Sequence, residues 1–401
     1  MISVVQSIGL SVITFLVVLG LVVTIHELGH FVVAKTFGVA IEKFSIGFGR
    51  AIFSRTDRSG VEWQIGWIPL GGYVRFAGDE NDASVPDQND LAQMRARIIA
   101  REGPGAERKY FPFKPLWQRA MVAAAGPVAN FLLAIILFSF LFAVIGQRVT
   151  PAVVGLVAPN TPAARADFRV GDRIISADGN AIADQGELVR YVTVRDNQQI
   201  DFVVLRNAQP IHILATPARV TIANDLNIEQ RGGQLGLGFS GGQWVRYPLH
   251  QAVVRGVVQT GSVINTTVFY LGRMITGQVP ADQIGGPLQI AQVTGAVANA
   301  SLHRDVPLRD KLLGGAVGLV SLAAFISVSV GFMNLLPVPV LDGGHLLFYA
   351  YEAVARRPLA GAIQSAGYRV GLALLLCLML FATWNDLQRL RVFQSFGGLF
   401  S

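Results

Sequence analysis

The residues with the clearest chemical potential are His26, Glu27 and His30, in the five-residue segment His-Glu-Leu-Gly-His. On a helix, positions i and i+4 share a face, so both imidazoles can reach one metal ion. The carboxylate of Glu27 stands beside them, placed to take a proton from water that a zinc ion activates. The pattern also arises by chance, so its setting must be considered.

The segment lies inside an apolar run. Residues 1–34 contain no Lys or Arg, and Glu27 is their only acidic residue. A carboxylate near the middle of a membrane helix costs about 2.5 to 3.5 kcal/mol on insertion scales, which favours a functional reason for its presence. Two alternatives stay open. An ion-coupled transporter also places His and Glu in its spans, and the side chains could merely satisfy one another inside a bundle.

A catalytic zinc ion has three protein ligands and one open position, so a third ligand must come from elsewhere. The candidate is Asp342, in the segment Asn-Leu-Leu-Pro-Val-Pro-Val-Leu-Asp-Gly-Gly-His from Asn334 to His345. Pro337 and Pro339 prevent a regular helix and leave backbone groups free to line a cavity. The alternative is that Asp342 only caps the following helix. His345 could also bind a metal, but we favour an interfacial histidine.

The composition indicates a polytopic membrane protein. Of the 401 residues, 52% are hydrophobic and 15% are charged. A membrane helix needs about 20 apolar residues. The single cysteine, Cys377, excludes disulfides and cysteine-based metal sites. The net charge of +7 comes from scattered basic residues, which favours membrane lipids over nucleic acid as a partner. Four transmembrane helices are expected, at residues 1–34 and near 120–146, 312–336 and 366–384.

Basic residues predict the orientation of these spans. Segment 35–118 is rich in Lys and Arg, and Arg356 and Arg357 lie between the third and fourth spans. By the positive-inside rule both connections face the cytoplasm. The N-terminus, the C-terminus and segment 147–311 are then extracytoplasmic. In this orientation the candidate metal ligands lie toward the cytoplasmic side of the membrane.

Four domains or parts are expected along the chain. Within the first loop, residues 40–76 alternate apolar and polar residues with Gly at the breaks, which predicts a β-hairpin. It either dips toward the active site or is an ordinary soluble hairpin. Residues 77–110 are predicted to be a flexible connection. The expected parts are an N-terminal membrane part at 1–149, an α+β domain at 150–220, an extracytoplasmic connection with an amphipathic surface helix at 221–311, and a C-terminal membrane part at 312–401.

Part of the predicted α+β domain resembles a bacterial PDZ domain. The resemblance is carried by Arg169-Val-Gly-Asp-Arg-Ile-Ile-Ser-Ala-Asp-Gly-Asn. Strands are expected at 153–157, 173–176, 200–205 and 211–215, around a helical stretch near Gln185–Val194. PDZ domains bind extended peptide ends by strand addition. Leu235-Gly-Leu-Gly-Phe looks like the carboxylate-binding loop of other PDZ domains. Because it follows the last expected strand, we predict a short strand outside the groove.

Together these motifs resemble the site-2 proteases, of the bacterial regulator of sigma-E protease type with a single PDZ domain. The match rests on His26 to His30, on Gly126-Pro-Val-Ala-Asn130, on the PDZ-like insert and on Asn334 to His345, in the family's order. The resemblance implies an intramembrane zinc metalloendopeptidase of the bacterial inner membrane. The roles it implies are zinc ligation by His26, His30 and Asp342, water activation by Glu27, and a substrate-facing position for Asn130 and Asn334.

The resemblance also implies the substrates. They would be single-pass transmembrane proteins, such as anti-sigma factors already trimmed by another protease, and leftover signal peptides. The PDZ domain would gate their entry, by binding a peptide or as a size filter. Some relatives carry two PDZ domains in tandem, whereas this sequence contains one. A third function, that of a PDZ-bearing membrane scaffold without activity, predicts that changing Glu27 affects only stability.

Overall fold

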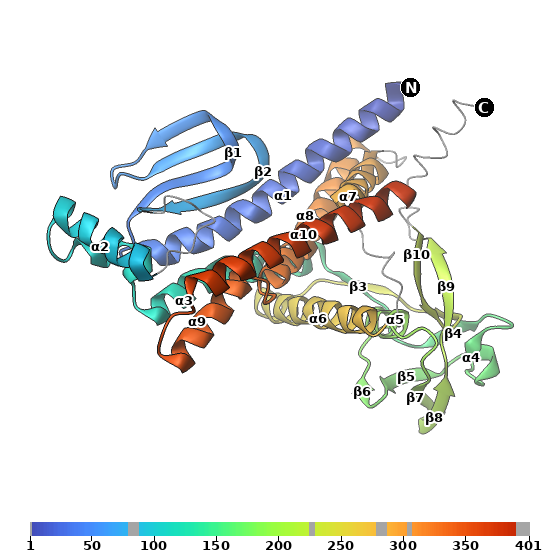
Figure 1. Cartoon of the computed structure of the whole chain (residues 1–401). Helices are drawn as coiled ribbons and strands as arrows, with labels where there is room; N and C mark the ends of the chain where they lie inside the picture. The colour runs from blue at the N-terminus through green and yellow to red at the C-terminus, as the bar shows by residue number, and fades with distance from the viewer. Residues whose placement is uncertain (1, 79–87, 224–228, 278–286, 303–306, 390–401) are drawn as a thin grey trace, which may run out of the picture. The chain divides into compact units, whose positions relative to one another are not determined.

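A computed structural model of the chain describes residues 2–78, 88–223, 229–277, 287–302 and 307–389 (Figure 1). The chain divides into two compact units. The core unit combines Met1–Leu137 with Gly285–Ser401, and the inserted unit is Phe138–Ile284. The core unit therefore contains both the His-Glu-Leu-Gly-His segment and Asp342, although the inserted unit separates them in sequence.

Four helices among the described residues are long and apolar enough to cross a membrane, as the sequence predicts. Between 22% and 33% of the most apolar window of each helix is buried, so most of these side chains face outward. The candidate spans are Ser11–Thr36 within α1 (Ile2–Thr36), Leu116–Ile145 over α3 (Leu116–Phe140) and the π-helical turn η3 (Leu141–Ile145), Leu308–Asn334 as α8, and Gly361–Gln388 within α10 (Gly361–Arg389).

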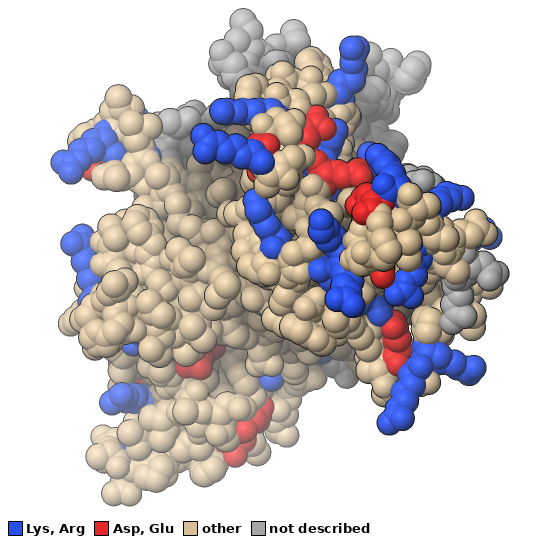
Figure 2. Space-filling model, turned by 90° about the vertical axis from the view of Figure 1, so that its left-hand side faces the viewer, with Lys and Arg blue, Asp and Glu red and all other residues tan. Residues whose placement is uncertain are grey.

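Apolar side chains on the spans are available to lipid. Val17 is 65% exposed, Ile136 63% and Leu380 71%. Single apolar side chains are common on any protein surface, but rows of them along 20-residue helices match the hydrocarbon core of a bilayer. On the face that Figure 2 displays, charged side chains gather on one part, and another broad area carries few of them.

The predicted hairpin is present as β1 (Ile41–Thr56) and β2 (Glu62–Phe76), which pair antiparallel. Lys43 pairs with Arg75 and also with Glu62, so the first part of β1 lies between the two ends of β2. The hairpin lies along α1 in Figure 1, and β2 contacts that helix. A cluster of apolar side chains joins hairpin to helix, with Phe31, Phe44 and Val61 buried at its centre.

The prediction of a flexible connection at 77–110 is wrong for much of that segment. Residues Gln88–Glu102 form α2, and two short 3-10 helices follow at Ala106–Lys109 and Phe111–Phe113. The high charge of α2 suggested a disordered segment, but its apolar residues recur at helical spacing, and Ile98 is 7% exposed. Residues 79–87 lie outside the described part of the chain.

A further helix of the core unit was not expected. It is α7 (Pro287–Leu302), which contacts α1, α8 and α10. The Gly- and Pro-containing stretch that leads into α7 suggested a break in structure. Residues 278–286 of that stretch lie outside the described part of the chain. The last helix before α10 is α9 (Asp342–Ala355).

The inserted unit contains the strands and the helix that the sequence predicts. Four strands form one sheet in the order β6-β5-β7-β8, antiparallel throughout, and α5 (Gln185–Thr193) lies beside them. The strands are β5 (Arg173–Ala177), β6 (Asn180–Ala181), β7 (Ile200–Arg206) and β8 (Gln209–Ala215). The core between sheet and helix includes the fully buried Phe202 and Leu188.

Several shorter strand pairs complete the inserted unit. Leu235-Gly-Leu-Gly-Phe does contain a short strand, β11 (Leu237–Phe239), and it pairs antiparallel with β4 (Val154–Val157) from the start of the domain. Although β11 comes late in the sequence, it therefore pairs with β4, one of the first strands of the unit. The remaining pairs are β3 (Gln147–Val149) with β12 (Gln243–Val245) and β9 (Ala218–Ala223) with β10 (Glu229–Gln234). The amphipathic helix predicted at 246–276 is α6 (Leu249–Ile275).

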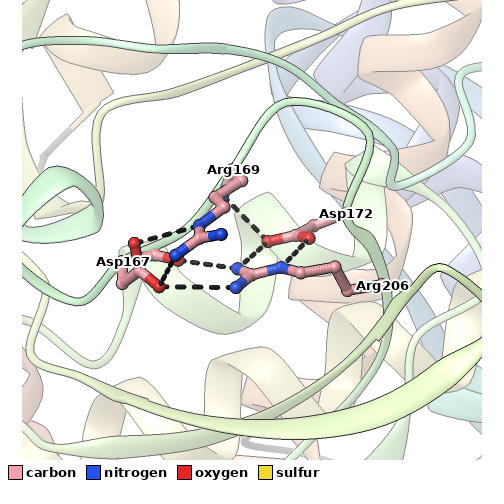
Figure 3. Close-up of polar contacts among 4 residues, drawn as sticks. All are labelled: Asp167, Arg169, Asp172 and Arg206. Carbon is pink, nitrogen blue, oxygen red and sulfur yellow. Dashed lines mark hydrogen bonds and ion pairs between the residues drawn. The ribbon is translucent and has the colours of Figure 1, made fainter.

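An ionic network closes the turn that precedes β5 (Figure 3). The guanidinium of Arg206 donates two hydrogen bonds to the carboxylate of Asp172, each of 2.8 Å. The same carboxylate accepts the backbone N–H of Arg169 at 2.9 Å. Asp172 is 1% exposed, so the network ties the turn to the end of β7. The PDZ-like motif at this turn thus has a structural role.

Candidate metal centre

Helix α1 presents His26 and His30 on one face, as the i and i+4 spacing predicts. Their Nε2 atoms lie 3.2 Å apart. The Oδ2 atom of Asp342, from the start of α9, lies 3.1 Å from Nε2 of His26 and 3.5 Å from Nε2 of His30. The structure thus brings together the three side chains that the sequence nominated as metal ligands.

The three donor atoms fit a zinc ion. Four ligands at zinc bond lengths of 2.0–2.2 Å in tetrahedral geometry stand roughly 3.3 Å from one another, and the three separations here are close to that distance. Oδ2 of Asp342 is buried and has no hydrogen-bond donor among the described residues. A buried carboxylate oxygen beside two imidazole nitrogens must be compensated for its lost solvation, and either a bound metal ion or a protonated imidazole supplies that compensation. The donor set leaves one tetrahedral position open.

Helix α3 fixes the orientation of both imidazoles. Nδ1 of His30 lies 2.8 Å from the backbone oxygen of Val122, to which it can donate a hydrogen bond. Nδ1 of His26 lies 3.2 Å from the side-chain amide of Asn130. With Nδ1 engaged in this way, Nε2 of each ring is the atom that faces Asp342. Sequence reasoning missed Val122, and a backbone carbonyl leaves no signal in the residue type.

Glycine at position 126 makes room for this arrangement. A Cβ atom at Gly126 would overlap Nε2 of His30 and come within 2.7 Å of Cε1 of His26. Across the same contact, a Cβ atom at Gly29 would overlap the backbone oxygen of Ala125 and lie 2.7 Å from Cβ of Ala129. The two glycines therefore allow α1 and α3 to approach closely. The sequence indicated Gly126 only as part of a motif, without this function.

Asp342 is the first residue of α9, and its side chain does not cap that helix. The N-cap residue is Leu341, which makes no side-chain capping bond, so the simple capping role considered for Asp342 is wrong. Its carboxylate still benefits from the positive end of the helix dipole. A Cβ atom at Gly343 or Gly344 would overlap backbone oxygens of the Asn334–Val340 segment, so the two glycines let α9 begin tightly against that segment.

His345 stands one turn after Asp342 but turns to another partner. Its Nε2 lies 2.7 Å from the hydroxyl of Tyr368 on α10. Burial lowers the pKa of His345, which favours the neutral ring as acceptor of the Tyr368 hydroxyl hydrogen. His345 is not in the metal-binding cluster formed by the described residues, so the structure does not support a metal-ligand role for it.

Glu27 lies between the histidine pair and the hairpin. A Cβ atom at Gly72 of β2 would come within 3.2 Å of Cγ of Glu27, and the backbone of Val74 also lies near the Glu27 carboxylate. Glu27 is half-buried and is not part of the three-residue donor set. It is therefore held beside the donors, where a general base would stand.

The two asparagines differ in their surroundings. Asn334, the last residue of α8, is half-buried, and its side chain makes no hydrogen bond with the described residues. Asn130 is completely buried on α3. Of the two, only Asn334 combines partial exposure with a free amide.

Comparison with known proteins identifies the family. Residues 14–378 match the profile described as Peptidase family M50. The chain belongs to this family. Metalloprotease MmpA of Caulobacter vibrioides is 50% identical over 98% of this chain and 99% of its own length. The putative zinc metalloproteases Atu1380 of Agrobacterium fabrum and R01501 of Rhizobium meliloti are 39% and 40% identical over 94% and 93% of this chain, and over 96% and 95% of their own lengths.

Membership of the M50 peptidases confirms the enzyme class expected from the sequence. The chain is an intramembrane metalloprotease, its cofactor is zinc, and its four apolar helices and its family place it in the inner membrane. The transporter and the inactive scaffold are thereby excluded. The structure of a PDZ domain of an SdrC-like protein from Listeria monocytogenes aligns with 23% of this chain and with 90% of its own length, at 16% identity. The TM-score of 0.18 is too low to define the fold.

Proposed function

We propose that His26, His30 and Asp342 hold the catalytic zinc ion and that Glu27 is the general base. The observation that carries this proposal is the convergence of Oδ2 of Asp342 on the two Nε2 atoms at 3.1 and 3.5 Å. Two imidazoles and one carboxylate are a frequent ligand set of catalytic zinc, with the fourth position left for water or substrate.

The protein side chains divide the reaction between them. Zinc, when bound, supplies the Lewis acid that polarises the reacting groups. Glu27 takes the proton of the attacking water and returns it to the leaving amine, because the same carboxylate can act first as base and then as acid. The free amide of Asn334 hydrogen-bonds the substrate backbone or the oxygen that gains charge. Together these groups hydrolyse one peptide bond.

The hairpin is proposed to hold the substrate. A peptide bond in a transmembrane helix is protected by its backbone hydrogen bonds, so the segment must unwind before attack. An unwound segment can be held by strand addition to a sheet. The end of β2 supports this role, because Gly72 and Val74 lie directly against Glu27. A strand added here would have its backbone beside the base.

The substrates are proposed to be single-pass transmembrane proteins, such as trimmed anti-sigma factors, and signal-peptide remnants. In this proposal the parts are a membrane part at 1–149, a PDZ domain at 150–220, a connection at 221–311 and a second membrane part at 312–401. The PDZ domain and both termini face outward, and the metal centre lies toward the cytoplasm. The basic residues of 35–118 support this orientation. The PDZ domain then screens substrates before they enter the membrane part.

The replacement Glu27→Gln tests the catalytic assignment. It keeps the size and polarity of the side chain but removes its basicity. We expect the purified variant to retain zinc and to lose cleavage of a model transmembrane substrate by at least about a hundredfold, the lower range for general base catalysis. Glu102→Gln is a matched control, because Glu102 is exposed on α2, outside the hairpin, and its replacement should leave cleavage unchanged. Full cleavage by Glu27→Gln would refute the assignment.

Gating can be tested with two forms of one substrate. The forms share a transmembrane segment, and one carries a folded outer domain. We expect the trimmed form to be cleaved faster by the complete protein. Equal cleavage of both forms would contradict the screening role but would leave the zinc site untouched.

A further inference from the structure

Asn130 occupies an unusual position for a substrate-binding residue. Its side chain is completely buried on α3, and its amide lies 3.2 Å from Nδ1 of His26. Its backbone oxygen accepts the Ser327 hydroxyl hydrogen at 2.8 Å, which joins this point of α3 to α8. A Cβ atom at Gly331 would stand 3.1 Å from Cβ of Asn130, so α8 covers the residue closely. A side chain enclosed in this way faces another protein group, not an incoming peptide.

The metal ligation proposed above determines what His26 needs from this neighbour. A neutral imidazole carries its hydrogen on one nitrogen and a lone pair on the other. If Nε2 of His26 gives its lone pair to zinc, then Nδ1 carries the hydrogen and must donate it. An acceptor is therefore required at the place that the Asn130 amide occupies.

The two orientations of the amide differ in this respect. With the nitrogen toward His26, two hydrogen-bond donors would oppose each other at 3.2 Å, while Oδ1 of Asn130 is buried without a partner. A rotation of the amide by half a turn exchanges its oxygen and nitrogen at nearly the same positions. The unpaired groups of the amide fall from two to one, because the opposed donors are replaced by a hydrogen bond from Nδ1–H to Oδ1. The metal-binding tautomer thus selects the orientation with oxygen toward His26.

We propose that Asn130 is a positioning residue for the zinc site. Its Oδ1 atom accepts the Nδ1 hydrogen of His26 and so fixes the orientation and the tautomer of that ring. This inference rests on the proposed ligation by His26. It assigns Asn130 to metal binding in place of the substrate contact that the family resemblance implies. Val122 supports it by analogy within the same site, because its backbone oxygen stands 2.8 Å from Nδ1 of His30. Helix α3 then orients both histidines, one through its backbone and one through a side chain.

Replacement of Asn130 by Asp and by Leu separates the two roles. Leu has a similar size and no acceptor, whereas Asp keeps an acceptor oxygen in the same place. We expect Asn130→Leu to weaken zinc binding about 10- to 100-fold, as is usual when a partner of a ligating histidine is lost. Asn130→Asp should bind zinc at least as tightly as the wild type. The measurement is zinc affinity of the full-length protein in detergent, by competition with a chelator.

Ser327→Ala is the matched control. It removes the hydrogen bond to the backbone oxygen of Asn130 and leaves the amide in place, so it disturbs the same helix contact without removing the acceptor. We expect its zinc affinity to be unchanged. Unchanged zinc affinity in Asn130→Leu, with a raised KM for substrate, would overturn the positioning role and restore the substrate contact.

A second measurement uses the wild-type protein and so does not depend on the folding of a variant. Nitrogen NMR of wild-type protein labelled in histidine, with zinc bound, should show Nδ1 of His26 protonated and Nε2 bound to the metal. An unprotonated Nδ1 would overturn the inference. A different result would contradict the proposed ligand set, namely full zinc affinity in His26→Ala. Failure of one proposal is therefore distinguishable from failure of the other.

Discussion

Nε2 of His26 lies 3.1 Å from Oδ2 of Asp342, although the inserted unit separates the two residues in the sequence. Two segments of the core unit, the α1 helix and the start of α9, must therefore meet at atomic precision. The contact has no donor for the buried carboxylate oxygen among the described residues. Two potential electron-pair donors at this separation fit coordination of one metal ion, which supports the proposed zinc site.

The replacement Asp342→Asn should lower zinc occupancy. An amide oxygen is a weaker, uncharged ligand, and zinc sites use carboxylates, imidazoles and thiolates. Elemental analysis of the purified protein measures the change. Asp310→Asn, at an exposed carboxylate in the first turn of α8, is the control and should retain full occupancy. Full occupancy in Asp342→Asn would remove Asp342 from the ligand set.

The replacement Gly126→Ala should damage the metal centre through a single methyl group. The added Cβ atom would overlap Nε2 of His30 and crowd Cε1 of His26, so the helices must separate or the rings must turn. Zinc affinity and cleavage are expected to fall together by at least about tenfold, the lower range for disturbance of the groups around a metal site.

Gly20→Ala provides the comparison for this change. It is also in a helix, on α1, but a Cβ atom there meets nothing within 4 Å. Ala is favoured over Gly in a helix by up to about 1 kcal/mol, so helix propensity improves in both variants. Normal zinc affinity in Gly126→Ala would show that the helices can relax around the methyl group.

Removal of zinc should lower the thermal stability of the core unit. A ligand that binds only the folded state stabilises it in proportion to the logarithm of its concentration over Kd. Chelation should lower Tm and abolish cleavage, and added zinc should restore both. Glu27→Gln should show the same shift in Tm, because it keeps the three ligands. A Tm that does not respond to zinc would argue against a site built across α1 and α9.

The turn network of the inserted unit should make that unit sensitive to acid. Burial alone would raise the pKa of Asp172, but the hydrogen bonds from Arg206 and from the backbone of Arg169 outweigh burial and hold the pKa below its usual 3.8. A carboxyl group whose folded pKa is depressed contributes stability above its unfolded pKa and loses that contribution as pH falls through the folded value. The expected loss therefore lies below about pH 4.

Hydrogen exchange at the amides of β5 and β7 in the full-length protein measures this effect, after correction for the intrinsic dependence of exchange on pH. Asp172→Asn should lower local stability at neutral pH by roughly 3 kcal/mol, because it removes the buried carboxylate that pairs with the guanidinium of Arg206 and leaves only the exposed Asp167 as a charged partner. The control is Asp201→Asn, whose ion pair with His212 is solvent-exposed and contributes about 0 to 1 kcal/mol. Equal protection in both variants would show that the network does not stabilise the turn.

Elements whose signal is local were predictable from the sequence. The spans followed from apolar length, and the strands β5, β7 and β8 followed from short runs of β-branched residues between turns. The amphipathic pattern of α6 was equally clear. By contrast, α2 was mistaken for a flexible segment because its charges masked the apolar residues at helical spacing, including Ile98. The pairing of β11 with β4 was missed, because pairing is a matter of spatial neighbours and not of order in the chain.

The sequence by itself determined which side chains could form the site. The spacing of His26 and His30 forces them onto one helical face, and the apolar setting makes Glu27 costly unless it has a function. Only the tertiary structure decided that Asp342 reaches both imidazoles and that Asn130 is enclosed behind His26. Those contacts join different helices, and their distances depend on how closely the backbones approach. For α1 and α3 that approach is set by the absence of side-chain atoms at Gly29 and Gly126, which a sequence shows only as two small residues.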